Sequence, residues 1–142
     1  MQVSKAMTRN VRIANPDHSI CDVARIMADA DIGALPVGDK DRLVGMITDR
    51  DIAVRAVAQG LPPETKVREV MSHEVMYCFE DEDISHVVDN IGDLQIHRLP
   101  VLSRAKRLVG IVSLADIAAS EGPEEAGEAV CGILASSGRA PH

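Results

Sequence analysis

Aromatic side chains are nearly absent from this chain of 142 residues, which has one Tyr, one Phe and no Trp. Tyr77 and Phe79 are the only rings that could stack on a nucleic-acid base, and proteins that bind single strands depend on such stacking. An excess of basic residues is also missing, because the net charge at pH 7 is -7, whereas phosphate backbones are bound through basic patches. The composition therefore argues against nucleic acid as a partner.

Long apolar runs are missing as well. No uncharged apolar stretch reaches the roughly 18 residues that a membrane-spanning helix needs. The N-terminal residues Met1-Gln2-Val3-Ser4-Lys5 also lack the apolar segment of a signal peptide. We therefore expect a cytoplasmic protein that has no membrane partner.

Cysteines and catalytic motifs are scarce too. Cys21, Cys78 and Cys131 are odd in number and far apart, unlike a secreted disulfide framework or a paired-cysteine zinc site. We expect buried or idle thiols and no metal site, with metal ligation and redox sensing as the alternatives. The chain has no nucleophile elbow, no His-Glu metalloprotease helix and no glycine-rich phosphate loop. We therefore expect neither enzymatic activity nor a required cofactor.

What the chain does contain is an internal repeat. The first copy has the segments Met7-Thr8, Ile32-Gly33-Ala34-Leu35-Pro36-Val37, Leu43-Val44-Gly45 and Thr48-Asp49-Arg50-Asp51-Ile52. The second copy has Met71-Ser72, Ile96-His97-Arg98-Leu99-Pro100-Val101, Leu108-Val109-Gly110 and Ser113-Leu114-Ala115-Asp116-Ile117. Pro36 and Pro100 are 64 residues apart and Gly45 and Gly110 are 65 apart, so one residue is inserted between them, at a hairpin turn. A unit of about 60 residues has a marginal core, so we expect the copies to fold together.

Periodicity and turn residues predict the same element order in both copies, which is strand, helix, strand, strand, helix. In the first copy these elements cover residues 11–14, 19–30, 34–37, 43–48 and 49–59. In the second copy they cover residues 75–79, 84–94, 99–102 and 108–113, with a last helix from residue 114. The predicted fold class is α/β (α+β), with tandem repeats packed in pseudo-twofold symmetry.

These elements suggest four segments. Residues 1–60 form the first repeat, residues 61–68 a linker stiffened by two prolines, residues 69–121 the second repeat, and residues 122–142 a C-terminal helical tail. Within the tail, residues 124–135 are weakly amphipathic and the last residues resemble a frayed terminus.

The second helix of the first copy is apolar around much of its circumference from Asp51 to Ala58. Such a helix usually buries more than one face, so we expect one face to contact another subunit. The alternative is that an alanine-rich surface costs little to expose.

A hydroxyl and a carboxylate three residues apart occur at both strand-to-helix junctions, as Thr48 with Asp51 and as Ser113 with Asp116. This spacing is that of a capping box, which stabilises a helix by about 0.5–2 kcal/mol. It also suits an anion site, because the N-terminus of a helix presents free N–H groups and a positive dipole. The hydroxyl would then contact phosphate and the carboxylate ribose, and both interpretations can hold for one residue.

His97 and Arg98 precede a strand in the second copy, where the first copy has Gly33 and Ala34. Arg before a strand is commonly a solvated surface residue. Beside Ser113, however, a guanidinium and an imidazole would neutralise a phosphate, and this interpretation is favoured.

The apolar-Pro-Val strand, the Leu-Val-Gly strand and the terminal Thr/Ser-x-x-Asp, each present twice, resemble a cystathionine β-synthase (CBS) domain pair, or Bateman module. The resemblance covers about residues 1–120 and is specific because the motifs recur at matching offsets. The segments Gly33-Ala34-Leu35-Pro36-Val37 and Gly45-Met46-Ile47-Thr48-Asp49-Arg50-Asp51-Ile52 are similar to those of short bacterial proteins made of little besides one such pair.

This resemblance implies two clefts for adenosine-containing ligands such as AMP, ADP, ATP or S-adenosylmethionine. It assigns ribose to Asp51 and Asp116, phosphate to Thr48, Ser113, His97 and Arg98, and adenine to Val11, Ile13, Val75 and Tyr77. The first cleft departs from the phosphate-binding pattern at Gly33 and Ala34, which predicts weaker binding of phosphorylated ligands there. The resemblance also implies a homodimer formed through the module helices.

The leading hypothesis is therefore a non-enzymatic regulatory module that binds an adenine nucleotide or a related adenosyl ligand between its repeats. The alternative is a ligand-free dimerisation or adaptor module that acts through protein partners, in which both Thr/Ser-x-x-Asp pairs are only helix caps.

Overall fold

A computed structural model describes residues 1–94 and 98–121 of the chain. It has helices and strands in the predicted order, which confirms the mixed α/β class. The described residues form two compact units. One unit contains Arg12–Val75, and the other contains residues 1–11 together with the residues from Met76 onward.

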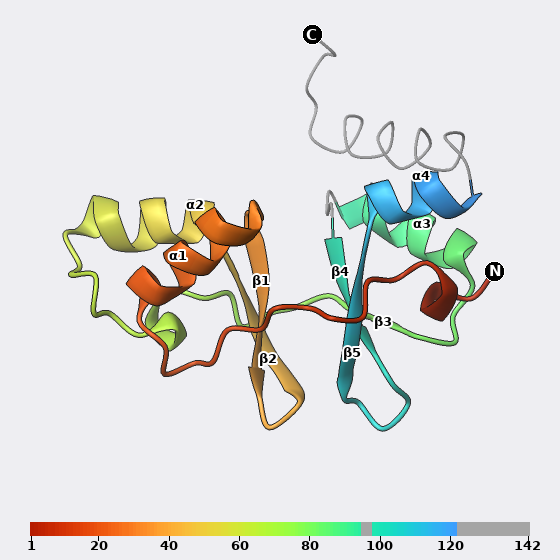
Figure 1. Cartoon of the computed structure of the whole chain (residues 1–142), viewed down its shortest axis with the longest axis horizontal. Coiled ribbons are helices and arrows are strands. Elements are labelled where there is room, and N and C mark those ends of the chain that lie inside the picture. The colour runs from red at the N-terminus through yellow and green to blue at the C-terminus, as the bar shows by residue number, and fades with distance from the viewer. Residues whose placement is uncertain (95–97, 122–142) are drawn as a thin grey trace, which may run out of the picture. The chain divides into compact units, whose positions relative to one another are not determined.

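The unit Arg12–Val75 is a helix followed by a hairpin and a second helical segment. Helix α1 (Ile20–Ala30) precedes the antiparallel strands β1 (Ala34–Asp39) and β2 (Arg42–Thr48). Helix α2 (Asp49–Asp51) continues as a π-helical turn over Ile52–Ala56 and a 3-10 turn over Val57–Gln59. Figure 1 shows α1 and α2 on the same side of the hairpin.

Local sequence explains where these helices begin and end. Ser19 caps α1 by accepting a hydrogen bond from the Asp22 N–H, as the sequence predicts. Gly60 ends the second helical segment in the left-handed conformation, with φ of 75°, which glycine adopts without strain. The core of this unit is formed where the apolar face of α1 meets the hairpin, and its members include Ile20, Val23, Met27, Leu35, Val37 and Ile47.

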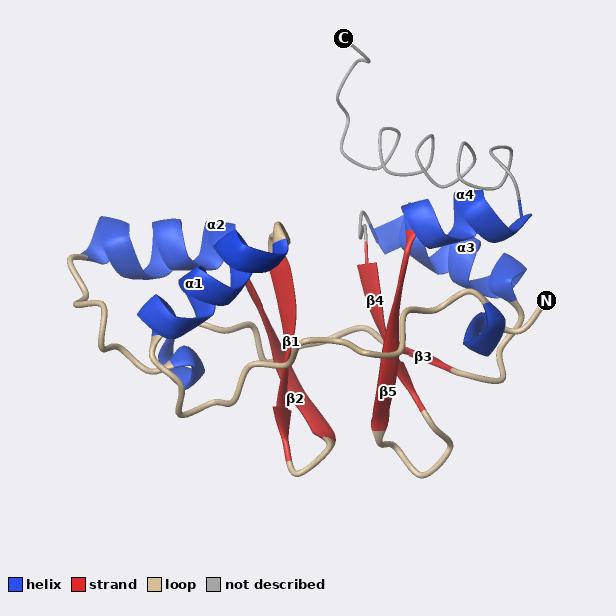
Figure 2. Cartoon of the chain, viewed as in Figure 1, coloured by secondary structure: helices blue, strands red, loops and turns tan. Residues whose placement is uncertain are grey.

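The other unit repeats this plan. Its elements are β3 (Cys78–Phe79), α3 (Ile84–Leu94), β4 (Arg98–Leu102), β5 (Leu108–Ser113) and α4 (Leu114–Glu121). The sheet order is β3-β4-β5, with β3 parallel to β4 and β5 antiparallel to it. The core of this unit includes Val3, Met7, Ile84, Val87, Leu99, Val101, Val112 and Ile117. Figure 2 shows these strands in red and the helices in blue.

The N-terminal segment of each repeat packs on the other repeat. Thr8 pairs with Ile111 of β5 through two backbone hydrogen bonds of 2.8 and 3.0 Å. Ser72 pairs in the same way with Met46 of β2, through bonds of 2.8 and 3.0 Å. The compact units therefore divide the chain differently from the repeats, because the chain passes from one unit to the other after Val11 and again after Val75.

The glycine of each Leu-Val-Gly segment allows this close pairing. A Cβ at Gly45 would lie 2.6 Å from the Ser72 carbonyl oxygen, and one at Gly110 would lie 2.7 Å from the Thr8 carbonyl oxygen. Both distances are far shorter than a van der Waals contact. Any side chain at these positions would therefore separate the paired backbones.

Two expected strands are corrected. The strand predicted at residues 11–14 is reduced to a bridge between Ala14 and Val37, and the strand predicted at residues 75–79 is only the two-residue β3. In the segment 61–68, predicted as a linker, Thr65 and Val67 are buried and the Thr65 carbonyl accepts a hydrogen bond from the Ile20 N–H. The tail predicted at residues 122–142 lies outside the described residues.

Candidate functional site

The β2–α2 junction holds the predicted capping box. The Thr48 hydroxyl accepts a hydrogen bond of 3.0 Å from the Asp51 N–H, and Asp51 Oδ2 accepts one of 3.0 Å from the Thr48 N–H. Asp51 Oδ1 lies 3.8 Å from Arg55 Nε, one helical turn onward. The prediction of a helix cap is confirmed here, and one oxygen of Asp51 is used for it.

The β5–α4 junction repeats this geometry in the other unit. Asp116 Oδ2 accepts a hydrogen bond of 3.0 Å from the Ser113 N–H, and the Ser113 hydroxyl accepts one of 3.2 Å from the Asp116 N–H. Ser120 stands one helical turn after Asp116, where the first repeat has Arg55. The chain therefore offers no cation at this position to pair with the second oxygen of Asp116.

Arg98 lies directly opposite Ser113 in the antiparallel pairing of β4 and β5. The Arg98 side chain is exposed. The equivalent pair in the first repeat is Ala34 opposite Thr48. The strand pairing therefore sets an arginine opposite the capping serine of the second repeat and an alanine opposite the capping threonine of the first. His97 lies outside the described residues.

Asp49 contributes a feature of the first junction that the sequence analysis missed. Its N–H donates to the Gly33 carbonyl at 2.9 Å, and its Oδ1 accepts the Arg50 N–H at 2.8 Å. Asp49 Oδ2 lies 3.0 Å from the position that a Cβ at Gly33 would take. Comparison of the repeats holds the signal for this carboxylate, because the residue equivalent to Asp49 is Leu114.

The four candidate adenine contacts are divided between the units. Val11 and Tyr77 belong to one unit, and Ile13 and Val75 belong to the other. Ile13 and Tyr77 are 40% and 39% exposed, which is unusual for large apolar side chains. The Tyr77 ring packs edge-on against Phe79, with 5.6 Å between ring centroids.

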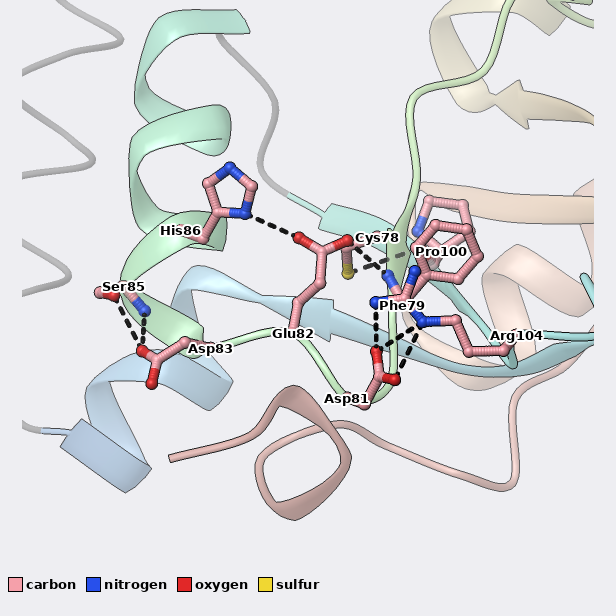
Figure 3. Close-up of polar contacts among 9 residues, drawn as sticks. All are labelled: Cys78, Phe79, Asp81, Glu82, Asp83, Ser85, His86, Pro100 and Arg104. Atoms are coloured by element: carbon pink, nitrogen blue, oxygen red, sulfur yellow. Dashed lines mark hydrogen bonds and ion pairs between the residues drawn. The ribbon is translucent and has the colours of Figure 1, made fainter.

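A polar cluster follows β3 in the loop that leads to α3 (Figure 3). The Arg104 guanidinium lies 4.2 Å above the Phe79 ring and 2.8 Å from Asp81 Oδ1. The hydrogen bond from Arg104 lowers the pKa of Asp81 below its ordinary value. Glu82 accepts hydrogen bonds from the Phe79 N–H and from the His86 ring. These contacts hold the loop in place.

The described part of the chain contains two free cysteines, Cys21 and Cys78. Burial raises the pKa of Cys78 to about 12, and its Sγ lies 3.9 Å from the Pro100 carbonyl oxygen. Cys21 is half-buried and free, and Cys131 lies outside the described residues. Residues 1–94 and 98–121 contain no group of three or more His, Cys, Asp or Glu side chains that could hold a metal ion. Within the same ranges, no helix has the length and apolar character to cross a membrane.

Comparison with known proteins agrees with the two-repeat organisation of the chain. The family model described as "CBS domain" matches the chain twice, over residues 3–57 and 67–121. The "CBS domain-containing protein YhcV" of Bacillus subtilis (strain 168) is 38% identical over 132 residues, which cover 92% of this chain and 94% of the relative.

Solved structures agree with this match. The crystal structure of Hypoxic Response Protein I with two coordinated zinc ions has a TM-score of 0.77 at 37% identity, covering 84% of this chain and 98% of that one. The CBS domain pair of protein MJ0100, in complex with 5′-methylthioadenosine and S-adenosyl-L-methionine, has a TM-score of 0.75 at 32% identity. That likeness covers 87% of this chain and 98% of that one.

Proposed function

The chain belongs to the CBS domain family, and on that premise we propose that it is a non-enzymatic regulatory module that binds an adenine nucleotide. The observation that carries the proposal is the pairing of Arg98 with Ser113 at the capped junction of the second repeat. Arg98 is the first residue of β4 and lies opposite Ser113, the residue before α4. The positive charge of Arg98 and the N-terminus of α4 both favour an anion. The bound nucleotide would therefore place its phosphate at this junction.

Each residue of this junction has a role in the proposal. Asp116 uses Oδ2 for the helix cap, so Oδ1 can accept a hydrogen bond from a ribose hydroxyl. Ser113 and Arg98 would donate to the phosphate, and His97 would add a further donor. At the equivalent junction of the first repeat, Asp51 would hold the ribose of a second ligand and Thr48 would lie near the 5′ end of that ligand.

The adenine would rest on aliphatic and aromatic side chains. Ile13 and Tyr77 have large exposed apolar surfaces, and Val11 and Val75 complete the proposed set. Burying such surfaces against an adenine is favourable, at about 25 cal/mol per Å² of apolar area removed from water. The solved relative MJ0100, which carries two adenosyl compounds, supports an adenosyl ligand of this kind.

Regulation would follow from a difference in affinity. A ligand shifts a conformational equilibrium only when it binds one state more tightly than the other. We therefore propose that nucleotide binding changes the setting of the two repeats, and that a protein partner in the cytoplasm reads that setting.

Calorimetric titration with AMP, ADP, ATP, NADH and S-adenosylmethionine tests the proposal. We expect saturable binding of an adenine nucleotide that is lost in Asp116→Asn and weakened about tenfold or more in Arg98→Ala. An Asn amide oxygen can still accept the Ser113 N–H, so Asp116→Asn keeps the helix cap. Asp29→Asn, an exposed substitution on α1, is the matched control and should bind as the wild type does. Binding of none of the five compounds would overturn the proposal.

A specific observation favours self-association as a second property. Val54, Val57 and Leu61 are 45%, 68% and 40% exposed at the end of the helical segment that begins with α2. An apolar patch of this kind suits a homodimer contact. Light scattering should show a dimer that Val57→Asp converts to a monomer, whereas a wild-type monomer would contradict this proposal.

A further inference from the structure

The two capped junctions share one backbone geometry but differ in the groups that surround an anion. Both use a hydroxyl and a carboxylate three residues apart, with hydrogen bonds of 3.0 to 3.2 Å. Between them lie Asp49 and Arg50 in the first repeat and Leu114 and Ala115 in the second. The junctions can therefore bind the same ribose and still differ toward a phosphate.

The first junction uses its own groups to fill the place of an anion. The N–H groups of residues 48 to 51 are bound in turn by Asp51 Oδ2, the Gly33 carbonyl, Asp49 Oδ1 and the Thr48 hydroxyl. An anion at a helix N-terminus needs these same N–H groups as donors. A phosphate that accepted a hydrogen bond from the Arg50 N–H would have to displace the Asp49 carboxylate.

The charge of Asp49 acts in the same direction. Its carboxylate lies against Gly33, with Oδ2 3.0 Å from the position of a Cβ there. Gly33 and Ala34 are the residues that the second repeat replaces with His97 and Arg98. Two arginines lie on this helical turn. Arg55 lies 3.8 Å from Asp51 Oδ1 and is paired with that carboxylate. Arg50 directly follows Asp49, and its side chain is exposed. A like charge within a few ångströms disfavours a second anion.

The second junction lacks this block. Leu114 has no oxygen atom, so the Ala115 N–H cannot be bound by its neighbour's side chain as the Arg50 N–H is bound by Asp49. The exposed Arg98 is paired with Ser113 across the sheet. A donor and a cation are therefore offered together at this junction.

We infer that Asp49 is a specificity-determining residue that restricts the first junction to adenosyl ligands without a phosphate, either an uncharged 5′-thioether or a cationic sulfonium. The second junction takes the phosphorylated ligand, so that one chain senses two chemical classes at once. This inference rests on the proposed adenosyl-binding function and adds the ligand class of the first junction to it.

The test titrates AMP and 5′-methylthioadenosine into the full chain by calorimetry. AMP should bind one site that is lost in Asp116→Asn and kept in Asp51→Asn. The thioether should keep a site in Asp116→Asn that is lost when Asp51→Asn is added. Asp49→Asn, introduced together with Asp116→Asn, should raise the affinity of the first junction for AMP about tenfold or more while changing that for the thioether less than about twofold.

Two further variants serve as controls for this test. Leu114→Asp places the carboxylate in the second junction and should weaken AMP there about tenfold, with the thioether unaffected. Asp49→Ser keeps a hydroxyl acceptor for the Arg50 N–H and should behave like Asp49→Asn if charge is the cause. Thermal unfolding confirms that each variant is folded before it is titrated.

The outcomes separate the two proposals. If AMP binds in an Asp116-dependent way but Asp49→Asn and Asp49→Ser leave AMP affinity at the first junction unchanged or undetectable, the inference about Asp49 is wrong and the proposed function stands. AMP that already binds both junctions of the wild type would also overturn the inference. If the wild type binds neither compound, the proposed function and the inference fail together.

Discussion

The junctions of the two repeats can be compared residue by residue. Thr48 and Asp51 form the same reciprocal hydrogen bonds as Ser113 and Asp116. Around these identical caps the charges differ, because Asp49 has no counterpart in the second repeat. The comparison teaches that the cap belongs to the fold, whereas the neighbouring charges can vary independently and carry specificity.

The N-terminal segments of the two repeats also pack in equivalent ways. Met7 and Met71 each place a thioether against the glycine of the other repeat, with the sulfur 2.7 and 2.9 Å from the position of a Cβ at Gly110 and Gly45. Both methionines are buried. If equal geometry gives equal stabilisation, equivalent substitutions in the two repeats should lower the free energy of unfolding by equal amounts.

The largest expected effect is that of Met7→Ala and Met71→Ala. Each substitution removes a buried side chain and should lower the free energy of unfolding by about 2–5 kcal/mol. Hydrogen exchange should place the lost protection in β4 and β5 for Met7→Ala and in β1 and β2 for Met71→Ala. Lost protection in the repeat that directly follows each methionine would show that the observed packing is wrong.

The next effect is that of Gly45→Ala and Gly110→Ala. A methyl group at either site would overlap a backbone carbonyl, and overpacking of this kind costs about 1–3 kcal/mol. Gly38→Ala is the matched control, because its Cβ would lie 2.9 Å from a side-chain atom, Ile13 Cγ2, and at an ordinary contact distance of 3.6 Å from the Arg42 carbonyl oxygen. Urea unfolding should give similar losses for the first two variants and a smaller loss for the control. Equal losses in all three would contradict the argument.

Removal of one cap hydroxyl should have a smaller effect. Thr48→Ala and Ser113→Ala should each lower the free energy of unfolding by about 0.5–2 kcal/mol. Ser103→Ala, which removes a half-buried hydroxyl that accepts the Arg107 N–H in a turn, compares the helix caps with a turn hydroxyl. If the free energy of unfolding falls several times more at one junction than at the other, the two caps are not energetically equivalent.

The smallest effect concerns two exposed carboxylates, one in each unit. Hydrogen bonds from Arg68 lower the pKa of Asp17, and those from Arg104 lower the pKa of Asp81. A carboxylate whose pKa is lowered by folding stabilises the folded state above its unfolded pKa, and this contribution is lost as the pH falls through the folded pKa. Carboxyl titration by NMR should show each pKa return toward its ordinary value in Arg68→Ala or Arg104→Ala. An unchanged titration would mean that the ion pair does not persist in solution.

Local sequence signals predicted most elements of the fold. The apolar spacing of residues 84–94 predicts α3 over its observed length, and Ser19 predicts the start of α1. These signals are reliable because caps and helical periodicity act within one or two turns. The prediction failed at residues 11–14, where a short alternating pattern does not specify how many residues will find a partner strand.

The sequence could not predict on which repeat the segments of Met7 and Met71 pack, and the reason is different. Met7 and Met71 each precede the Leu-Val-Gly glycine of their own repeat, by 38 and 39 residues. This repeat pattern would be the same whether each methionine packed on its own repeat or on the other. The Asp49 contact could not be predicted from the capping box, because that motif is defined only by its first and last residues, Thr48 and Asp51. Alignment of the two copies, which sets Asp49 beside Leu114, holds the information that the motif alone lacks.

The pairing of Thr8 with Ile111 has a consequence for synthesis on the ribosome. About a hundred residues must be added after Thr8 before its partner strand exists, which takes on the order of 5–20 seconds at typical elongation rates. The unit Arg12–Val75 can close during this interval, while Val3 and Met7 still lack the core that will bury them. The segment around Thr8 is therefore placed later than the unit Arg12–Val75, and its apolar side chains stay accessible to a chaperone until Ile111 has been made.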